Sequence, residues 1–347
     1  MDLHKILEIK IDGYCSFLTL SKDGNLLYFL SNSSLFIYDI PSTQLKKVIR
    51  YSEGNYCSVV DLKINETGDA VAILFEGCSR GGYFDHDKYF TQLLVINSKN
   101  DQQRLIVNKD FFHFSLSFEE DSRIIFDNEI RIDGTLIGID WGKNNEIACK
   151  CSPLLYNEQF SLFTKRNLRL ELKSLNIETP SPELKPITIG ESFVDDFLWS
   201  INKNHLAWSC YDKTIKVKTN RNNTMLLRHD SNVTGFTWID DNSIISITEN
   251  GKIRLWRNGE EIQNHWKKGE IIEYIWASNK GMHLIVKFGG GDYMILSSDC
   301  FCHVIDTDFL RQVQGDGYLR YIPNFDQIYF ADLDKSGKKL QLLRIQI

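Results

Sequence analysis

Tryptophan recurs at a nearly constant interval in the C-terminal half of the chain. Trp199, Trp238 and Trp276 are separated by 39 and 38 positions. Each ends a short apolar segment and is followed by a polar turn and then by a second apolar segment. Such segments are typical of half-buried strands, and a period of about 40 residues with several short strands is typical of a β-propeller blade. The spacing therefore predicts an all-β propeller.

The same strand–turn–strand pattern extends over the whole chain, which has no helical periodicity. Eight such patterns are visible in the 347 residues. The two around Phe118 and Trp141 are only 23 positions apart, too close for two complete blades. We therefore expect a closed propeller of four-stranded antiparallel blades, with seven blades favoured and eight possible. Residues 1–347 would form a single domain.

The two ends of the chain are predicted to complete one blade together. Residues 318–322, 327–331 and 340–345 supply three strands, and residues 3–11 alternate as one further strand. A sheet that lacks its last strand exposes unpaired backbone groups along one edge. We therefore expect the N-terminal strand to pair with the last three and to complete the final blade.

The segment from His229 to Trp256 carries the most informative motif of the repeat. It opens with Arg228-His229, continues through Ser246 and reaches a turn at Asn250 before it ends in tryptophan. In these positions it resembles a unit of the WD-repeat family, in which a histidine, a serine, a turn aspartate and a late tryptophan form a hydrogen-bonded network. Arg228 replaces the family's glycine, and Asn250 replaces the aspartate. The resemblance implies a structural network of His229, Ser246 and Trp256, and a function in assembling protein complexes.

Composition narrows the class of protein. The chain is 42% apolar and 25% charged, with a formal net charge of -6, which is typical of soluble globular proteins. Its N-terminus lacks the pattern of a secretory leader, and no apolar run is long enough to span a membrane. We therefore expect a cytoplasmic or nuclear protein without a membrane span, whose eight cysteines are reduced.

Two Cys-x-Cys pairs, at 149–151 and 300–302, look like metal ligands. Zinc sites require a second pair or histidines at fixed spacing, and neither accompanies them. Residues i and i+2 share one face of a strand. We therefore expect each pair to lie on a strand as small apolar filler.

The irregular segment 77–90 is the leading candidate for a partner-binding loop, because aromatic side chains dominate the energetics of protein interfaces. Asp85, His86 and Asp87 offer an alternative as metal ligands, but adjacent loop residues seldom converge on one ion without further ligands. We expect no metal and no cofactor. The candidate contact residues are Arg80, Tyr83, Phe84, Asp85, His86, Tyr89 and Phe90.

The most basic segment contains Lys165, Arg166 and Arg169. Such a cluster attracts phosphate backbones, whereas the acidic net charge of the chain opposes binding of nucleic acid. A solvated loop is the favoured interpretation, and a nucleic-acid-contacting subunit is the least favoured of the functions considered.

The sequence contains no nucleophile-elbow, zinc-protease or phosphate-loop motif. Together with the repeat, this predicts a non-catalytic scaffold for protein–protein interaction, as a subunit or adaptor of a multiprotein complex. The alternative is a propeller that binds a small ligand or acts as an enzyme through its central channel. The strands expected to line that channel, within 17–20, 59–62 and 236–238, are apolar, which weighs against the alternative.

Overall fold

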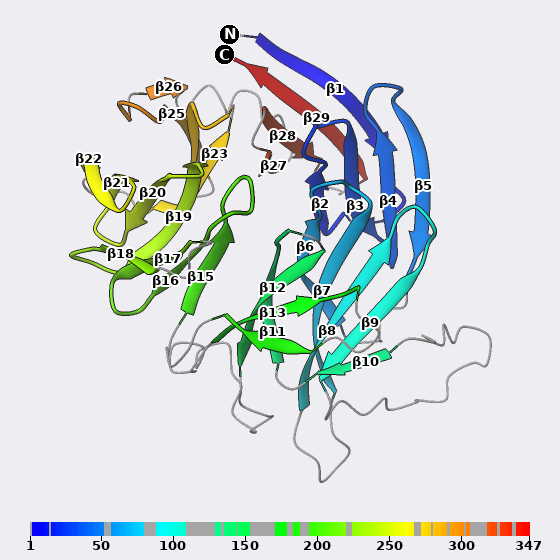
Figure 1. Cartoon of the computed structure of the whole chain (residues 1–347). Helices are drawn as coiled ribbons and strands as arrows, with labels where there is room; N and C mark the ends of the chain where they lie inside the picture. The colour runs from blue at the N-terminus through cyan, green and yellow to red at the C-terminus, as the bar shows by residue number, and fades with distance from the viewer. Residues whose placement is uncertain are drawn as a thin grey trace. The chain divides into compact units, whose positions relative to one another are not determined.

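The computed structural model describes residues 2–13, 15–51, 57–79, 88–108, 129–132, 135–143, 145–152, 171–178, 183–187, 194–219, 224–266, 272–278, 280–289, 292–301, 303–305, 318–324, 327–334 and 338–347. Every secondary-structure element in these ranges is a β-strand (Figure 1). No helix in them is long and apolar enough to cross a membrane. Contacts divide the chain into two compact units, one of residues 1–32, 37–46 and 195–347 and the other of residues 33–36 and 47–194.

Three four-stranded antiparallel sheets of the larger unit follow one another along the chain. The first consists of β15 (Val194–Trp199), β16 (Leu206–Cys210), β17 (Thr214–Lys218) and β18 (Thr224–Arg228). The second consists of β19 (Val233–Asp240), β20 (Ser243–Thr248), β21 (Lys252–Arg257) and β22 (Glu260–Trp266). The third consists of β23 (Ile272–Ser278), β24 (His283–Phe288), β25 (Tyr293–Ser297) and β26 (His303–Ile305).

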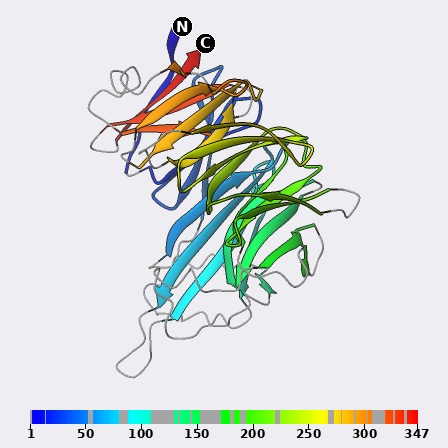
Figure 2. The same ribbon diagram turned by 90° about the vertical axis from the view of Figure 1, so that its left-hand side faces the viewer.

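A fourth sheet of this unit joins the two ends of the chain. Its order is β1 (Asp2–Lys10), β29 (Lys339–Gln346), β28 (Ile328–Leu333) and β27 (Tyr318–Ile322). The register of β1 against β29 runs from Asp2 opposite Gln346 to Lys10 opposite Lys339. The two ends lie side by side in both views (Figures 1 and 2). The prediction that the N-terminal strand completes the last blade is confirmed.

The remaining sheets come from the N-terminal half. One consists of β2 (Phe17–Leu20), β3 (Leu26–Ser31), β4 (Ser34–Asp39) and β5 (Gln44–Arg50), and its strands belong partly to each unit. The next consists of β6 (Cys57–Ile64), β7 (Ala70–Ser79), β8 (Lys88–Asn97), β9 (Gln103–Asn108) and β10 (Glu129–Ile132). The last consists of β11 (Thr135–Trp141), β12 (Glu146–Ser152), β13 (Glu171–Asn176) and β14 (Leu184–Pro186).

These seven sheets confirm seven blades rather than eight. Six have four strands, as expected, but β10 adds a fifth strand that runs parallel to β9. The expectation of four antiparallel strands in every blade is therefore wrong for this blade. It covers the outer edge of β9, whose backbone groups would otherwise lack partners. Phe118, which helped to decide the blade count, lies outside the described residues.

The sheets of the larger unit are apolar on both faces. Along β20 every side chain is buried. Ile244 and the neighbouring Trp256 pack toward β15–β18, whereas Ile245 and Leu255 pack toward β23–β26. Because successive strand residues point to opposite faces, this uninterrupted run of buried side chains is what a sheet between two others requires.

The two cysteine pairs have different outcomes. Cys149 and Cys151 are fully buried on β12, where burial raises the pKa of both thiols, to about 12 for Cys151. The prediction of buried filler is confirmed there. It is wrong for Cys300, which is exposed in the turn between β25 and β26. Phe301 takes the buried position of that turn.

Candidate functional site

The residues of the WD-like motif meet in the sheet β19–β22. His229 follows β18, Ser246 lies on β20 and Trp256 lies on β21. Trp256 Nε1 donates a hydrogen bond of 2.8 Å to Ser246 Oγ, and His229 Nε2 lies 2.8 Å from the same oxygen. The rings of His229 and Trp256 are 5.0 Å apart. The structure thus brings all three residues together around one buried hydroxyl.

The fourth position of the motif contacts a second hydroxyl. Asn250 accepts a hydrogen bond of 2.7 Å from the hydroxyl of Thr248. His229 Nδ1 is buried and has no hydrogen-bond partner among the described residues. Asn250 thus contacts Thr248, and the histidine joins the network through its Nε2 atom.

The environment of His229 disfavours its protonated form. Burial, and next the positive charge of Arg254, lower the pKa of His229 to about 4. Arg254 is itself buried and is held by Asp230, with 2.6 Å between Nη2 and Oδ1. Neutral His229 is therefore the form that the folded chain contains at neutral pH.

This shift predicts a pH-dependent loss of stability. Below about pH 6.5 the unfolded chain binds a proton at His229, whereas in the folded chain His229 stays neutral until the pH approaches about 4. The free energy of unfolding should therefore fall as the pH drops from about 6.5 to 4, by an amount on the order of 3 kcal/mol. Urea unfolding of the wild type and of His229→Gln over this range measures it. The variant should show a shallower fall, and His265→Gln, an exposed-histidine control, should not.

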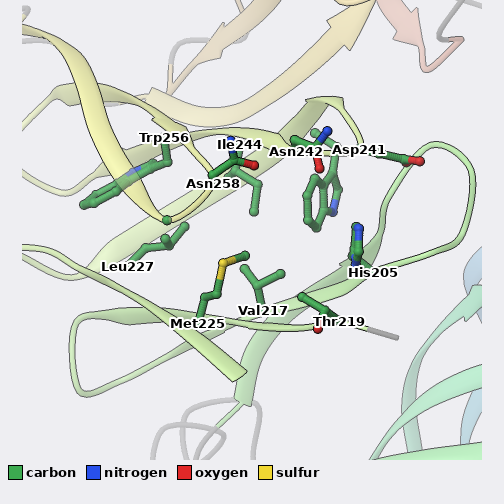
Figure 3. A pocket seen from close by; sticks show the side chains of 12 residues that line it. His205, Val217, Thr219, Met225, Leu227, Asp241, Asn242, Ile244, Trp256 and Asn258 are labelled. Atoms are coloured by element: carbon green, nitrogen blue, oxygen red, sulfur yellow. The ribbon is translucent and has the colours of Figure 1, made fainter. Parts of the chain in front are cut away.

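Trp256 also forms one wall of a pocket between β15–β18 and β19–β22 (Figure 3). The pocket has a volume of about 160 Å³. In the figure, Trp256 lies at one end, and His205 and Asp241 lie at the other. Its lining residues are His205, Val217, Thr219, Met225, Leu227, Trp238, Asp241, Asn242, Ile244, Trp256, Asn258 and Gly259.

Hydrogen bonds fix the walls and the rim of this pocket. Trp238 Nε1 donates to the carbonyl of Leu198 at 3.1 Å. Asp241 accepts hydrogen bonds from Asn202 and Asn204, with 2.8 Å to Asn202 Nδ2 and 3.0 Å to Asn204 Nδ2, and these contacts help to keep its pKa below the usual value. The pocket is therefore preformed, with an apolar floor and a polar rim.

A second exposed feature is an aromatic pair on β23. Tyr274 is 54% exposed and stacks on Trp276 with ring centroids 5.5 Å apart. Lys287 Nζ lies 5.4 Å from the centre of the Tyr274 ring and 2.8 Å from the carboxylate of Glu273. A large exposed ring that stacks on a neighbouring indole and lies near a paired cation is suited to contact another protein.

The first strands of the sheets in the smaller unit are more polar than expected. Burial raises the pKa of the Asp61 carboxyl on β6, and the carboxylate of Asp140 on β11 raises it further. Lys63, 3.8 Å away, acts in the opposite direction. Positions 59–62, interpreted from the sequence as an apolar strand, thus include a carboxyl group with a raised pKa beside the buried Leu62.

The two loops singled out from the sequence lie largely outside the described residues. Arg80, Tyr83, Phe84, Asp85 and His86 lie outside the described residues. Tyr89 and Phe90 belong to β8 by their backbone, but their side chains also lie outside the description. The basic segment with Lys165, Arg166 and Arg169 is likewise outside it. The part of the chain that is described contains no cluster of three or more His, Cys, Asp or Glu side chains placed to hold a metal ion.

Comparison with known proteins identifies the fold. The sequence matches no family model and no curated protein. The structure is similar to the β-propeller domain of Cps50 (Swd1) from Myceliophteria thermophila, with a TM-score of 0.61 and 8% sequence identity, over 99% of this chain and 100% of that one. At this identity the likeness concerns the fold alone. The fold is that of a seven-bladed β-propeller.

Proposed function

We propose that the chain is a non-catalytic scaffold for protein–protein interaction, working as a subunit or adaptor of a multiprotein complex. The observation that carries this proposal is the exposed Tyr274 stacked on Trp276. Aromatic side chains with few rotatable bonds bury a large area on binding at a low cost in conformational entropy. Likeness to another propeller domain supports the proposal only through the shared fold.

The surroundings of Tyr274 indicate a contact surface rather than a defect of packing. Its ring stacks on Trp276 and lies 5.4 Å from the ammonium group of Lys287, and Lys287 is in turn held by Glu273. Trp276 also contacts the buried ring of Tyr321, with centroids 5.2 Å apart. The exposed ring is thus the outer member of an aromatic row that continues into the core. A partner would meet a rigid apolar surface beside a paired cation.

Substitution of Tyr274 tests the scaffold proposal. Tagged wild-type chain, Tyr274→Ala and Tyr211→Ala would be purified in parallel from the source cells and their companions quantified. Tyr211 is the matched control, because it is also exposed but lies after β16. We expect Tyr274→Ala to lose at least about nine-tenths of a reproducible set of companions, as for a hot-spot residue worth more than about 1.4 kcal/mol. Tyr211→Ala should retain that set.

Two further results would complete this experiment. Tyr274→Ala should unfold in urea within about 1 kcal/mol of the wild type, since its ring is mostly exposed. A variant in which a two-residue Asn-Gly turn replaces residues 80–87 tests the aromatic loop in the same purification, because such a turn can join the paired ends of β7 and β8 at Ser79 and Lys88. If the wild-type chain has no reproducible companions, or if all variants keep the same set, the scaffold proposal does not stand in this form.

A small-ligand or enzymatic function is the second candidate, and one observation favours it. Asp61 and Asp140 interact on the first strands of two sheets, and the pKa of Asp61 is raised. Raised carboxyl pKa values are common at binding and catalytic sites. A ligand-dependent rise in melting temperature that Asp61→Asn abolishes would support this alternative.

A further inference from the structure

A groove in the larger unit combines an exposed methionine with two cationic side chains. It has a volume of about 720 Å³, and its walls include Lys280, Met282, Ile328, Arg344 and Ile345. We propose that this Met282 groove binds an acidic segment of a partner protein, with an apolar side chain of the segment on the methionine and its carboxylates on the two cations. The inference rests on the proposed scaffold function for the existence of a partner, but not for the chemistry of the groove.

The apolar part of the groove is accessible to a ligand. Met282 is 56% exposed, and the buried side chains of Ile328 and Ile345 line the same groove. An apolar side chain that covers this surface removes it from water, which is favourable, and a thioether adapts its shape to what it contacts. A cavity of about 150 Å³ in another protein holds a benzene molecule, so the groove has room for several side chains of a peptide.

The exposure of Met282 is imposed by a fixed turn. The preceding Gly281 has a φ of +83°, and a Cβ atom at this position would overlap the carbonyl oxygen of Ile239. Glycine therefore allows the turn to approach the end of β19 closely. The backbone NH of Ser298 donates a hydrogen bond of 3.0 Å to the carbonyl of Met282. The backbone on both sides of the methionine is thus held, while its side chain faces solvent.

Hydrogen bonds also join the turns around the groove. Ser278 Oγ, at the end of β23, lies 2.9 Å from the carbonyl oxygen of Asn324 and 2.7 Å from that of Gln327. Asn324 Nδ2 donates to the carbonyl of Ser21 at 3.1 Å. These contacts connect the turns that follow β23, β27 and β2. The groove is therefore preformed, so that binding has a low cost in ordering the chain.

The cationic side chains are available to a carboxylate. Arg344 Nη1 donates to Gln327 Oε1 at 3.4 Å, and the guanidinium group has five N–H donors in all. Lys280 is exposed, and neither cation forms an ion pair with another of the described residues. Asp23 also lines the groove, but it already accepts hydrogen bonds from the backbone NH and the side chain of Asn25. A guanidinium group can bind a carboxylate through two parallel hydrogen bonds.

The groove suits an acidic peptide better than a nucleic acid. None of the described residues that line it is aromatic, whereas single-stranded nucleic acids are generally held by stacking of their bases on aromatic rings. The Asp23 carboxylate and the net charge of -6 oppose a ligand with a phosphate on every unit. The exposed side-chain amides of Gln327 and Gln346 can pair with the NH and C=O groups of a peptide backbone.

A synthetic peptide tests this chemistry. Fluorescein-labelled Gly-Asp-Glu-Leu-Glu-Gly would be titrated against the whole chain by fluorescence anisotropy, beside one control with Asn and Gln in place of Asp and Glu and another with Ser in place of Leu. Each control should bind at least about tenfold more weakly, because it lacks charged hydrogen bonds or apolar burial. Added salt should weaken the parent peptide most. Equal affinities, or no saturable binding up to about 1 mM, would overturn the proposal.

Matched variants of the chain locate the binding. Arg344→Gln should weaken the peptide at least about tenfold, whereas Arg257→Gln, at an exposed arginine on β21, should not. Met282→Ser should weaken it severalfold, whereas Ile262→Ser, at a residue that is 52% exposed on β22, should leave the affinity unchanged. Circular dichroism would verify that all four variants fold. Full affinity in either groove variant would place the peptide elsewhere and overturn the proposal.

Other occupants of the groove give different results. Displacement of the peptide by oligothymidylate of equal charge would assign the groove to nucleic acid, and self-association that Met282→Ser abolishes would assign it to a second copy of the chain. Either result overturns the proposal. If Tyr274→Ala keeps every companion while the peptide binds as expected, only the scaffold proposal fails. If companions depend on Tyr274 but the wild type does not bind the peptide, only the proposal for the Met282 groove fails.

Discussion

Deletion of residues 2–10 is expected to abolish cooperative folding of the chain. This segment is strand β1, which pairs with β29 through eight residue pairs and buries Leu7 and Ile9 to 4% exposure. The lost side-chain burial and backbone hydrogen bonds amount to a destabilisation on the order of 8 kcal/mol. Stabilities of natural domains are of the same order. Urea unfolding followed by tryptophan fluorescence, together with size-exclusion chromatography, would measure the effect.

A circular permutant provides the control for this deletion. Asp2 lies opposite Gln346, so a short linker can join residue 347 to residue 2 while the new chain begins at residue 12. Strand β1 would then follow β29 as the second arm of a hairpin and pair in the same register. The permutant should recover most of the stability. If the deleted chain unfolds at the same urea concentration as the wild type, β1 does not contribute to closing the sheet and the interpretation is wrong.

The sequence predicted the fold well, because its signals are local. The alternation of apolar and polar residues identified the strands of the last sheet, with the predicted 318–322 matching β27 (Tyr318–Ile322). The spacing of Trp199, Trp238 and Trp276 located the first strands of three successive sheets, since each lies near the end of such a strand. A turn and the strand before it depend on a few neighbouring residues, so one sequence suffices to recognise them.

Features that depend on distant contacts were not predictable in this way. The fifth strand β10 pairs parallel to β9 across a long connection, and no local pattern marks such a partner. At Cys300 the alternation expected of a strand fails, because the chain turns there and buries Phe301 instead. The raised pKa of Asp61 also depends on Asp140 in the next sheet, about 80 positions away in the chain.

The pocket illustrates the same limit within the candidate site. Its walls come from β17, β18, β19, β20 and β21, and its rim comes from the turns that connect them. The motif residues His229, Ser246 and Trp256 were identified from the sequence as a structural network. The indole of Trp256 also forms the wall of a pocket opposite His205. This second role depends on how two sheets pack against each other, which the motif does not indicate. Trp256, which the motif assigned to a structural network, therefore also helps to shape the pocket.

Substitution of Trp256 is expected to have the second largest effect. Trp256 is buried, packs against Leu227 and Ile244, and donates the hydrogen bond to Ser246. Trp256→Ala removes a large buried side chain, which costs about 3–5 kcal/mol of the free energy of unfolding. Trp256→Phe keeps most of the ring but lacks the NH group, so it should cost about 1–2 kcal/mol. Urea unfolding of both variants measures the two values.

The difference between these variants separates packing from hydrogen bonding at Trp256. If the alanine variant is much less stable than the phenylalanine variant, the indole acts mainly as a wall between the two sheets. Equal losses of stability would instead assign the effect to the hydrogen bond with Ser246. A loss below about 1 kcal/mol for Trp256→Ala would contradict both its burial and its part in the network.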